Sequence, residues 1–391
     1  MDIQKYNVVL LGVSYFDGMA SSTRVRNLLE PLINKEVIEI KNLIYEKDAA
    51  GLKDKKGVLD KVTYQIIGFS KSNPFSIISF IYRGLKFLKR NKCKNKKNIL
   101  YNYEHPDIKN ISLILFAKIT GYKILFDIVE DNRYYDKNQR FLSKLKIRSS
   151  VFLLNQSRYF ADVILAISDH LLQIMKDIGK NEVPVYFIPI TVDLKKFKIS
   201  KSTPSKEIKI FYGGSFGAKD GLEYLIPAFQ KISEKYKNAY LVLTGRGTKA
   251  SSDRVKEMAS TSIAKDRIIF KGYLSINDYY TLLNTCDIFC MTRVNSNAAN
   301  AGFPFKLGEF LATGKAVVAT KVGDVPKYLV NNRNAILINP NSSKEIIDGL
   351  SFIIENADKR TSLGLNGRKT AEKYFDSEKV SKRLLEILET L

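Results

Sequence analysis

"NAANAGFPFKLGEFLATGKAVVAT", residues 297–320, has the pattern of a loop, a short helix and a buried strand in succession. Pro304 stands where the helix would begin, a position at which its missing N–H costs nothing. At roughly 100° per residue, one face of the helix is apolar, formed by Leu307, Phe310 and Leu311. The opposite face carries Lys306, Glu309 and Thr313. We therefore predict that the apolar face packs on a sheet and that the polar face looks toward a ligand.

Strand-like runs alternate with amphipathic helical runs along the whole chain of 391 residues. This alternation predicts mostly parallel sheets with helices on both faces. Two such series occur, so we predict two doubly wound α/β domains at 1–197 and 198–375, with a polar linker near 197–207. A separate amphipathic helix follows at 376–391. Ligands of open parallel sheets bind at the carboxyl ends of the strands, so the informative residues are expected there.

The chain is strongly basic, with 63 Lys and Arg against 40 Asp and Glu and a net charge of +23. Residues 51–100 hold 13 basic and 2 acidic residues, or 13 − 2 = +11. Such an excess favours a polyanionic binding partner, which could be an anionic membrane, nucleic acid or a phosphorylated ligand. A second explanation is that genome composition alone makes the sequence rich in Lys, Asn and Ile. Nucleic-acid binding is disfavoured, because no RNP-like signature, zinc-finger spacing or basic region with heptads occurs.

Cysteine and histidine contents disfavour several kinds of site. Three cysteines suit a reducing cytoplasm. Cys286 and Cys290 have no histidine nearby to complete a metal site, and no Asp-x-Asp stands where a metal–nucleotide site needs one. The two histidines, His105 and His170, make a histidine-based catalytic triad improbable. No apolar run approaches the ~20 residues of a membrane helix.

The helix after Pro304 has the features of a nucleotide-diphosphate site. The N–H groups of Phe305, Lys306 and Leu307 are predicted to be free at its start, where the helix dipole and the lysine favour an anion. Glu309, one turn further, can accept two hydrogen bonds from a ribose diol. The alternative is that Glu309 merely favours the first turns of a helix.

A second candidate is the glycine-rich loop in "FYGGSFGAKDGLEYLIPAF", residues 211–229. Gly213, Gly214 and Gly217 permit close backbone approach and Lys219 precedes a helix, as in a diphosphate cradle. The loop is neither a Walker loop nor a GxGxxG fingerprint. Alone it is a weak signal.

Other candidates follow predicted strands. Tyr273 could flank a nucleobase and Arg293 could reach a phosphate. In the first half, the chemistry-bearing residues are Gly18, Arg24, His105, Glu130 and Asp131. Asp131 has a second interpretation as a helix N-cap, and His170 is interpreted as a helix-surface residue.

Three segments together resemble family 4 glycosyltransferases, which are retaining enzymes of the GT-B fold. These are "VILAISDHLLQIMKDIG…VYFIPITVDLKKF", the glycine-rich segment above, and "FPFKLGEFLATGKAVVATKVGDVPKYL", which is the most specific match. The resemblance implies two Rossmann-like domains facing a central cleft, with an acceptor on the first and a nucleotide-sugar donor on the second. It also implies that helix 376–391 crosses back to the first domain.

The resemblance implies a role for each candidate residue. The catalytic residues would be Lys219, Glu309 and Asp131. The donor would be bound by Gly214, Ser215, Tyr273, Arg293, Asn300, Gly302, Phe303, Pro304, Phe305, Lys306 and Leu307. The acceptor would be bound by Gly18, Arg24, His105 and Glu130. No metal and no cofactor are expected, and the nucleotide-sugar is a substrate.

The sequence departs from the family pattern at two places. The first glutamate of the Glu-x7-Glu motif is replaced by Ala301, which puts the donor sugar in question. Gly213-Gly214-Ser215 stands where Gly-Arg is frequent, and Arg293 or Lys306 would replace the lost charge. The form Gly-Phe-Pro-x-Lys-Leu-Gly-Glu occurs among such enzymes, so inactivity is not inferred.

The expected activity is transfer of a sugar from a UDP- or GDP-sugar to a glycan or polyprenyl-linked acceptor in bacterial surface polysaccharide synthesis. A cytoplasmic location follows, with peripheral association at the inner face of the plasma membrane through Lys92–Lys97. Ala301 leaves open a non-catalytic, partner-binding subunit. A nucleotide-sugar epimerase on the same fold is a further alternative, and an oxidoreductase is disfavoured by the absent GxGxxG.

Overall fold

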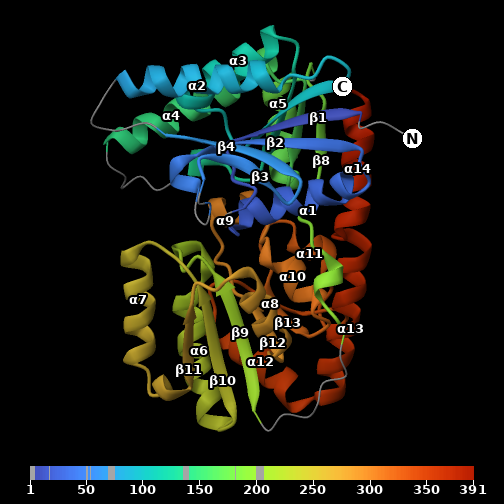
Figure 1. The fold of residues 1–391 in the computed structure, drawn as a ribbon. Helices are drawn as coiled ribbons and strands as arrows, with labels where there is room; N and C mark the ends of the chain where they lie inside the picture. The colour runs from blue at the N-terminus through green and yellow to red at the C-terminus, as the bar shows by residue number, and fades with distance from the viewer. Residues whose placement is uncertain are drawn as a thin grey trace. The chain divides into compact units, whose positions relative to one another are not determined.

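The structure, a computed structural model, describes residues 5–16, 18–49, 52, 54–68, 75–134, 141–180, 182–199 and 207–391. The chain forms two compact units. The first comprises Met1–Pro189 with Ser377–Leu391, and the second is Ile190–Asp376. Each has its own sheet and its own helices (Figure 1).

The first unit is built on a sheet of order β3-β4-β2-β1-β5-β6-β7-β8. Its strands are parallel except for β3, which runs antiparallel to β4. Strands β1, β2, β5, β6 and β7 are largely buried, as expected of strands covered on both faces. The bounds are β1 Tyr6–Leu11, β2 Ile38–Tyr45, β3 Lys56–Leu59, β4 Val62–Ile67, β5 Lys97–Tyr103, β6 Lys123–Ile128, β7 Val163–Ala166 and β8 Val185–Phe187.

The face of the first sheet that each helix covers follows from the direction in which the chain crosses the sheet. The chain moves one way from β1 to β2 and the other way from β4 through β5, β6 and β7 to β8. Right-handed crossovers therefore place α1 on one face and α2 to α5 on the other (Figure 1). Helix α14 packs against α1, and the Ser381 hydroxyl donates to the Leu28 carbonyl at 2.7 Å. The bounds are α1 Ala20–Asn34, α2 Phe75–Asn91, α3 Ile108–Ile119, α4 Phe141–Asn155, α5 Asp169–Gly179 and α14 Ser377–Glu389.

The second unit has an all-parallel sheet of order β11-β10-β9-β12-β13-β14. Its strands are β9 Ile208–Gly214, β10 Ala239–Gly245, β11 Ile268–Gly272, β12 Ile288–Met291, β13 Ala316–Thr320 and β14 Ile336–Ile338. Its helices are α6 Leu222–Lys235, α7 Lys249–Ser260, α8 Ile276–Asn284, α9 Asn297–Ala301, α10 Lys306–Ala312, α11 Val325–Tyr328, α12 Ser343–Glu355 and α13 Ala357–Tyr374.

Alternate residues of β9 enter different cores of the second unit. Ile210 belongs to an aliphatic core with Leu225 of α6. Phe211, on the opposite face, packs with Phe289 and Phe310 at ring-centroid distances of 5.3 and 5.7 Å. The prediction of two doubly wound α/β domains is confirmed, with the antiparallel edge strand β3 as an addition.

The units divide at Pro189/Ile190 rather than at the predicted 197/198. The segment after Ile190 packs on the second unit, since a Cβ at Gly308 would lie 2.9 Å from the Ile190 side chain. The Val192 N–H also donates to the Phe375 carbonyl at 2.7 Å. The predicted linker was placed by its polar composition, and its residues 200–206 lie outside the described residues. Within the part of the chain that the structure describes, no helix is long and apolar enough to cross a membrane.

Candidate active site

Helix α10 begins at Lys306, and Phe305 precedes it in helical conformation. Leu307 is fully buried, and its N–H donates to the Pro304 carbonyl at 3.0 Å. The prediction that the Leu307 N–H is free for a donor phosphate is therefore wrong, because the turn before the helix closes on it. The Leu307 side chain belongs to the core and offers a ligand nothing.

The polar face of α10 is covered by tyrosines of α8. Glu309 is only 3% exposed. Its Oε2 accepts from the Tyr279 hydroxyl at 3.0 Å, and its Oε1 lies 3.4 Å from the Tyr280 hydroxyl. Lys306 Nζ lies 3.2 Å from Glu309 Oε2 and 3.9 Å from the centre of the Tyr279 ring. Lysine and glutamate thus form one ion pair, and an incoming diol would have to displace a tyrosine hydroxyl.

Thr313 does not extend this polar face. It is buried, and its hydroxyl donates to the Phe310 carbonyl at 2.6 Å. A threonine near a helix end commonly satisfies a backbone carbonyl in this way. The predicted ligand-facing stripe is therefore reduced to Lys306 and Glu309.

The loop after β9 is closed by Asp220, which the sequence did not single out. Its Oδ2 accepts from the Ser215 hydroxyl at 2.6 Å and from the Gly217 N–H at 2.8 Å. Gly221 follows with φ +71°, and a Cβ there would lie 1.9 Å from the Thr292 carbonyl oxygen. Only glycine allows the loop to enter α6 at this distance from the loop after β12.

Backbone contacts place the Lys219 and Arg293 segments side by side. The Val294 N–H donates to the Lys219 carbonyl at 3.1 Å, and the Thr292 hydroxyl donates to the Asp220 carbonyl at 3.0 Å. The Arg293 carbonyl accepts from the Thr320 hydroxyl at 2.8 Å. Two predicted phosphate-binding cations therefore come from adjoining loops at the carboxyl ends of β9 and β12.

Tyr273 lies after β11 and is 49% exposed, with the Arg246 guanidinium 4.8 Å from its ring centre. Arg246 was missed from the sequence, because it follows a different strand, β10. The Thr244 hydroxyl donates to the Gly272 carbonyl at 2.6 Å and joins the two strand ends. An aromatic ring backed by a guanidinium offers a flat surface on which a base could stack.

The loop before α10 uses its polar groups internally. Asn300 donates from Nδ2 to Asn295 Oδ1 at 2.8 Å and accepts from the Gly323 N–H at 3.0 Å. Phe303 is 6% exposed and packs on Tyr328. The side chains of Asn300 and Phe303 therefore shape the loop, and their contact with the donor stays a prediction. Gly302 ends α9 after Ala301, which is 1% exposed.

In the first unit, Arg24 lies inside the core at 1% exposure. Its Nε and Nη2 each donate to Asp127 of β6 at 2.8 Å. The guanidinium also donates to the carbonyls of Ile188 and Pro189 at 3.1 and 2.8 Å. The prediction that Arg24 binds an acceptor is corrected, because α1 turns this side chain inward and its donors are engaged there.

His105 and Glu130 lie together at the carboxyl ends of β5 and β6. His105 is 6% exposed, and its Nε2 lies 2.7 Å from the Glu130 carbonyl oxygen. Burial lowers the pKa of His105, so the ring is neutral and Nε2 carries the proton that it donates. Within the described residues, Nδ1 is a buried acceptor with no hydrogen-bond partner. The predicted acceptor residue Gly18 lies in the loop after β1, with φ +70°.

Asp131 begins a short 3₁₀ turn, Asn132–Tyr134, and accepts from the Arg133 N–H at 3.0 Å. This contact matches the capping interpretation. Burial acts to raise the pKa of Asp131, but hydrogen bonds from Arg133 outweigh it, and the pKa lies below its usual value. His170 Nε2 lies 3.5 Å from Asp131 Oδ2. The predicted helix-surface histidine therefore stands beside the predicted catalytic carboxylate.

Comparisons with known proteins bear on the second unit most directly. A family model described as Glycosyl transferases group 1 matches residues 194–370. The uncharacterized glycosyltransferase MJ1069 of Methanocaldococcus jannaschii is 24% identical over 331 residues, 75% of this chain and 82% of the relative. Residues 194–370 thus match the group 1 glycosyltransferases, and the chain is a glycosyltransferase.

Two further likenesses extend over both units. A Campylobacter jejuni protein named N,N'-diacetylbacillosaminyl-diphospho-undecaprenol alpha-1,3-N-acetylgalactosaminyltransferase is 22% identical over 328 residues, 81% of this chain and 82% of the relative. The structure of HepE from Anabaena, in complex with UDP and glucose, matches with a TM-score of 0.76 and 15% identity over 98% of this chain and 100% of that chain. The fold of this glycosyltransferase is GT-B.

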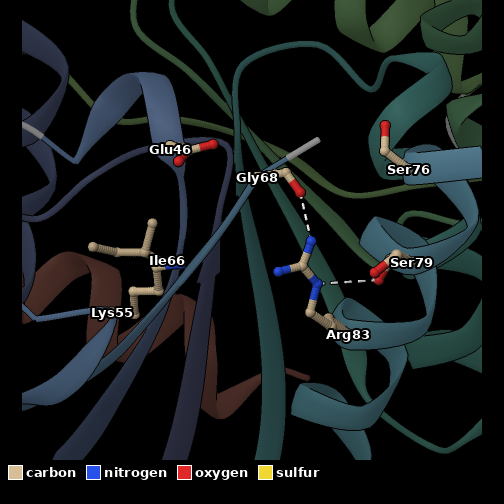
Figure 2. A pocket seen from close by; sticks show the side chains of 7 residues that line it. All are labelled: Glu46, Lys55, Ile66, Gly68, Ser76, Ser79 and Arg83. Atoms are coloured by element: carbon tan, nitrogen blue, oxygen red, sulfur yellow. Dashed lines mark hydrogen bonds between the residues drawn. The ribbon is translucent and has the colours of Figure 1, made fainter. Parts of the chain in front are cut away.

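One pocket of the glycosyltransferase contains none of the predicted residues (Figure 2). It lies between the end of β4 and helix α2. Arg83 donates to the Gly68 carbonyl at 2.6 Å and to the Ser79 carbonyl at 3.3 Å. Its lining is Glu46, Lys55, Ile66, Gly68, Ser76, Ser79 and Arg83. Because the arginine already bonds to the pocket's own walls, we assign this pocket no role in transfer.

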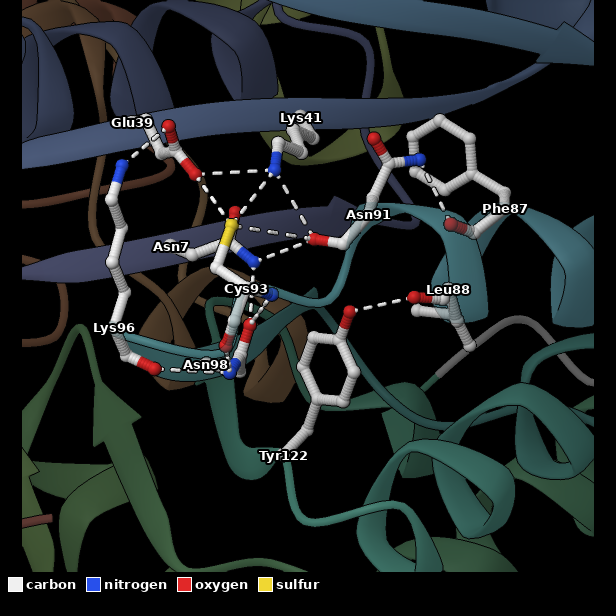
Figure 3. Close-up of polar contacts among 10 residues, drawn as sticks. All are labelled: Asn7, Glu39, Lys41, Phe87, Leu88, Asn91, Cys93, Lys96, Asn98 and Tyr122. Carbon is white, nitrogen blue, oxygen red and sulfur yellow. Dashed lines mark hydrogen bonds and ion pairs between the residues drawn. The ribbon is translucent and has the colours of Figure 1, made fainter.

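The predicted membrane-binding lysines 92–97 are not equivalent. Lys96 Nζ donates to Glu39 Oε2 at 2.8 Å, and the other oxygen of Glu39 contacts Lys41 Nζ at 3.1 Å and Cys93 Sγ at 3.0 Å (Figure 3). Lys96 is therefore engaged at the start of β5, whereas Lys92 and Lys94 are exposed. At least one of the four lysine charges predicted to bind the membrane is therefore engaged within the protein.

Glu39 provides a pH-dependent contribution to stability. Burial acts to raise its pKa, but hydrogen bonds from Cys93, Lys96 and Lys41 outweigh burial and lower the pKa from 4.5 to about 2. A lowered folded-state pKa stabilises the fold above the unfolded value and ceases to do so as pH falls through the folded value. We expect the stability difference between the wild type and Glu39→Gln to shrink as pH falls from 4.5 to about 2. Denaturant unfolding across this range measures it, and a constant difference would contradict the ion-pair explanation.

Proposed function

We propose that this glycosyltransferase is a family 4 enzyme that transfers a sugar, with retention, from a UDP- or GDP-sugar to a glycan or polyprenyl-linked acceptor. The observation that carries the proposal is the placement of cations in the segments that follow β9 and β12 of the second unit. Lys219 and Arg293 come from adjoining loops, and Lys306 pairs with Glu309 after the next loop. The HepE complex with UDP and glucose, on the same fold, supports a nucleotide-sugar donor.

In the proposed reaction these cations stabilise the leaving group. As the bond to the sugar breaks, negative charge builds on the distal phosphate and the sugar gains oxocarbenium character. Lysine and arginine side chains held in advance near that phosphate stabilise the transition state more than the ground state. The leaving phosphate itself helps to accept the acceptor's proton on the front face, so neither a protein base nor a divalent metal is needed.

Glu309 is proposed to bind the ribose hydroxyls. Its Oε1 contact with Tyr280 is long, at 3.4 Å, so this oxygen loses little by exchanging the tyrosine for a sugar hydroxyl. Oε2 keeps Tyr279 and Lys306. Tyr273 with Arg246 is proposed as the base platform, since it is the aromatic surface left exposed after β11.

The acceptor side is proposed to lie around His105, Glu130 and Asp131 of the first unit. The Nδ1 of neutral His105 is unpartnered within the described residues but buried, so an acceptor hydroxyl would reach it only after the neighbouring side chains move. The undecaprenol in the printed name of the Campylobacter relative supports a polyprenyl-linked acceptor in surface polysaccharide synthesis. Such an acceptor implies a cytoplasmic enzyme that associates peripherally with the anionic inner face of the plasma membrane.

Nucleoside diphosphate release by the purified protein tests the proposal. UDP- or GDP-sugar with a glycan acceptor should give a glycoside with the donor's anomeric configuration, at the same rate with and without EDTA. Loss of activity in EDTA that Mg²⁺ or Mn²⁺ restores would reject the metal-free mechanism. An inverted product would reject retention.

A second function is favoured by one observation. Ala301 is buried where related enzymes carry a glutamate, which is consistent with a non-catalytic subunit. Nucleotide-sugar binding without release or transfer, over a panel of donors and acceptors, would favour it. Interconversion of two nucleotide-sugars without acceptor would instead indicate an epimerase.

A further inference from the structure

Three neighbouring helices of the first unit carry no acidic residue. Helices α2, α3 and α4 contain four, two and three Lys or Arg and neither Asp nor Glu. Every other described helix of eight or more residues contains at least one acidic residue. The absence of acids is therefore local to these three helices and is not a property of the whole chain.

The same helices expose large apolar side chains away from the sheet. Their inner sides are buried, and a Cβ at Gly84 of α2 would lie 2.6 Å from the Leu113 side chain of α3. Their outer sides are apolar and exposed by between 44 and 84%, at Ile78, Tyr82, Leu115, Ile119, Leu145 and Phe152. Figure 1 shows α2, α3 and α4 on one side of the first sheet, and α3 contacts both neighbours. We call these six side chains the outer apolar surface.

Basic side chains lie among these apolar ones at helical spacing. On α2, Ile78, Tyr82, Lys86 and Lys89 follow one another along a single exposed face, and Arg90 is exposed beside them. On α4, the exposed Arg148 falls between Leu145 and Phe152. Lys118 of α3 lies 3.5 Å from Asp162 Oδ1 and is engaged there, so the exposed basic residues of interest are those of α2 and α4.

We propose that the outer apolar surface and its basic residues dock on an anionic lipid bilayer. Aliphatic and aromatic side chains enter the acyl boundary while lysine and arginine meet lipid phosphates, as in interfacial helices. A second copy of the chain is disfavoured as the occupant, since the same positive surface would face itself. The inference rests on the proposed function for the purpose of docking, because a bilayer would present a polyprenyl-linked acceptor. The attraction between this surface and anionic lipid does not depend on that function.

Vesicle binding by the full chain tests the electrostatic part. Vesicles of phosphatidylcholine with phosphatidylglycerol should bind the wild type at low salt, and vesicles of phosphatidylcholine alone should bind it weakly. The triple variant Lys86→Gln, Lys89→Gln, Arg90→Gln should bind the anionic vesicles about 100-fold more weakly. The matched control is Lys237→Gln, Lys256→Gln, Lys265→Gln, which removes the same charge from exposed sites of the second unit and should bind nearly as the wild type does.

A second pair of variants tests the apolar part. Ile119→Ser and Phe152→Ser should each weaken binding about tenfold, and the loss should persist at high salt. Ile263→Ser is the control, since Ile263 is 67% exposed on the second unit. Nucleoside diphosphate release with a water-soluble acceptor should not change in any of these variants, so failure of docking is distinguishable from failure of the proposed function.

Three results would overturn the proposal. The first is no binding of the wild type to anionic vesicles at low salt. The second is an equal loss in the second-unit lysine control, which would show that total charge and not this surface decides binding. The third is a wild-type oligomer that Ile119→Ser converts to a monomer with vesicle binding unchanged, which would make the surface an interface between copies.

Discussion

Glu309→Gln is expected to lower the affinity for UDP or GDP by about ten- to a hundred-fold. Glutamine keeps the shape and one hydrogen-bond acceptor but removes the charge that strengthens bonds to the ribose hydroxyls, and charge-assisted hydrogen bonds contribute about 1.5–3 kcal/mol. Lys306 would also lose its ion-pair partner at 3.2 Å. Isothermal titration with the free nucleotides measures the effect.

Two neighbouring substitutions serve as controls for Glu309→Gln. Lys306→Ala should weaken nucleoside diphosphate binding more than nucleoside binding, because the lysine is assigned to the phosphates. Leu307→Ala should instead lower the free energy of unfolding by about 2–5 kcal/mol, because this side chain is fully buried. If Glu309→Gln left nucleotide binding intact while unfolding the second unit, Glu309 would be a structural partner of Tyr279 and Tyr280 and not a ligand for ribose.

Asp127→Ala is expected to destabilise the first unit by about 3–5 kcal/mol. The substitution leaves the Arg24 guanidinium in the core without its counter-charge, and it removes the acceptor of the Tyr101 hydroxyl at 2.6 Å. In the wild type, burial acts to lower the pKa of Arg24 and the attraction of Asp127 raises it. Without Asp127 the guanidinium still stays charged, because arginine is not deprotonated in proteins, so deprotonation cannot relieve the loss. Hydrogen exchange of the β6 amides under native conditions measures the change.

The double variant Arg24→Met, Asp127→Leu is the matched control. Replacing both charges by apolar groups should restore most of the stability, since an isolated buried charge is far more costly than an apolar pair. Binding of UDP or GDP should not change in either variant, because the second unit carries the donor residues. Normal stability of Asp127→Ala together with lost transfer to the acceptor would instead restore Arg24 to the acceptor site.

The positions of the candidate loops could be predicted because they depend on local pattern. Apolar runs alternating with amphipathic ones identify strands and helices, and parallel strands carry their loops at one edge. Lys219, Tyr273 and Arg293 could therefore be assigned to strand ends before any contact was known. Arg246 and Asp220 could not, because their importance comes from Tyr273 on another strand and from the fold of their own loop.

By itself the sequence determined the two α/β domains, the resemblance to glycosyltransferases and the basic charge, since each follows from composition or from neighbours along the chain. Only the tertiary structure decided which candidates are available to a ligand. Arg24 is unavailable to a ligand because it pairs with Asp127, 103 residues away in the sequence. Glu309 is enclosed by Tyr279 and Tyr280 from the neighbouring helix. The outward placement of Ile119 and Phe152 was decided in the same way, because burial depends on partners that chain folding brings together from distant positions.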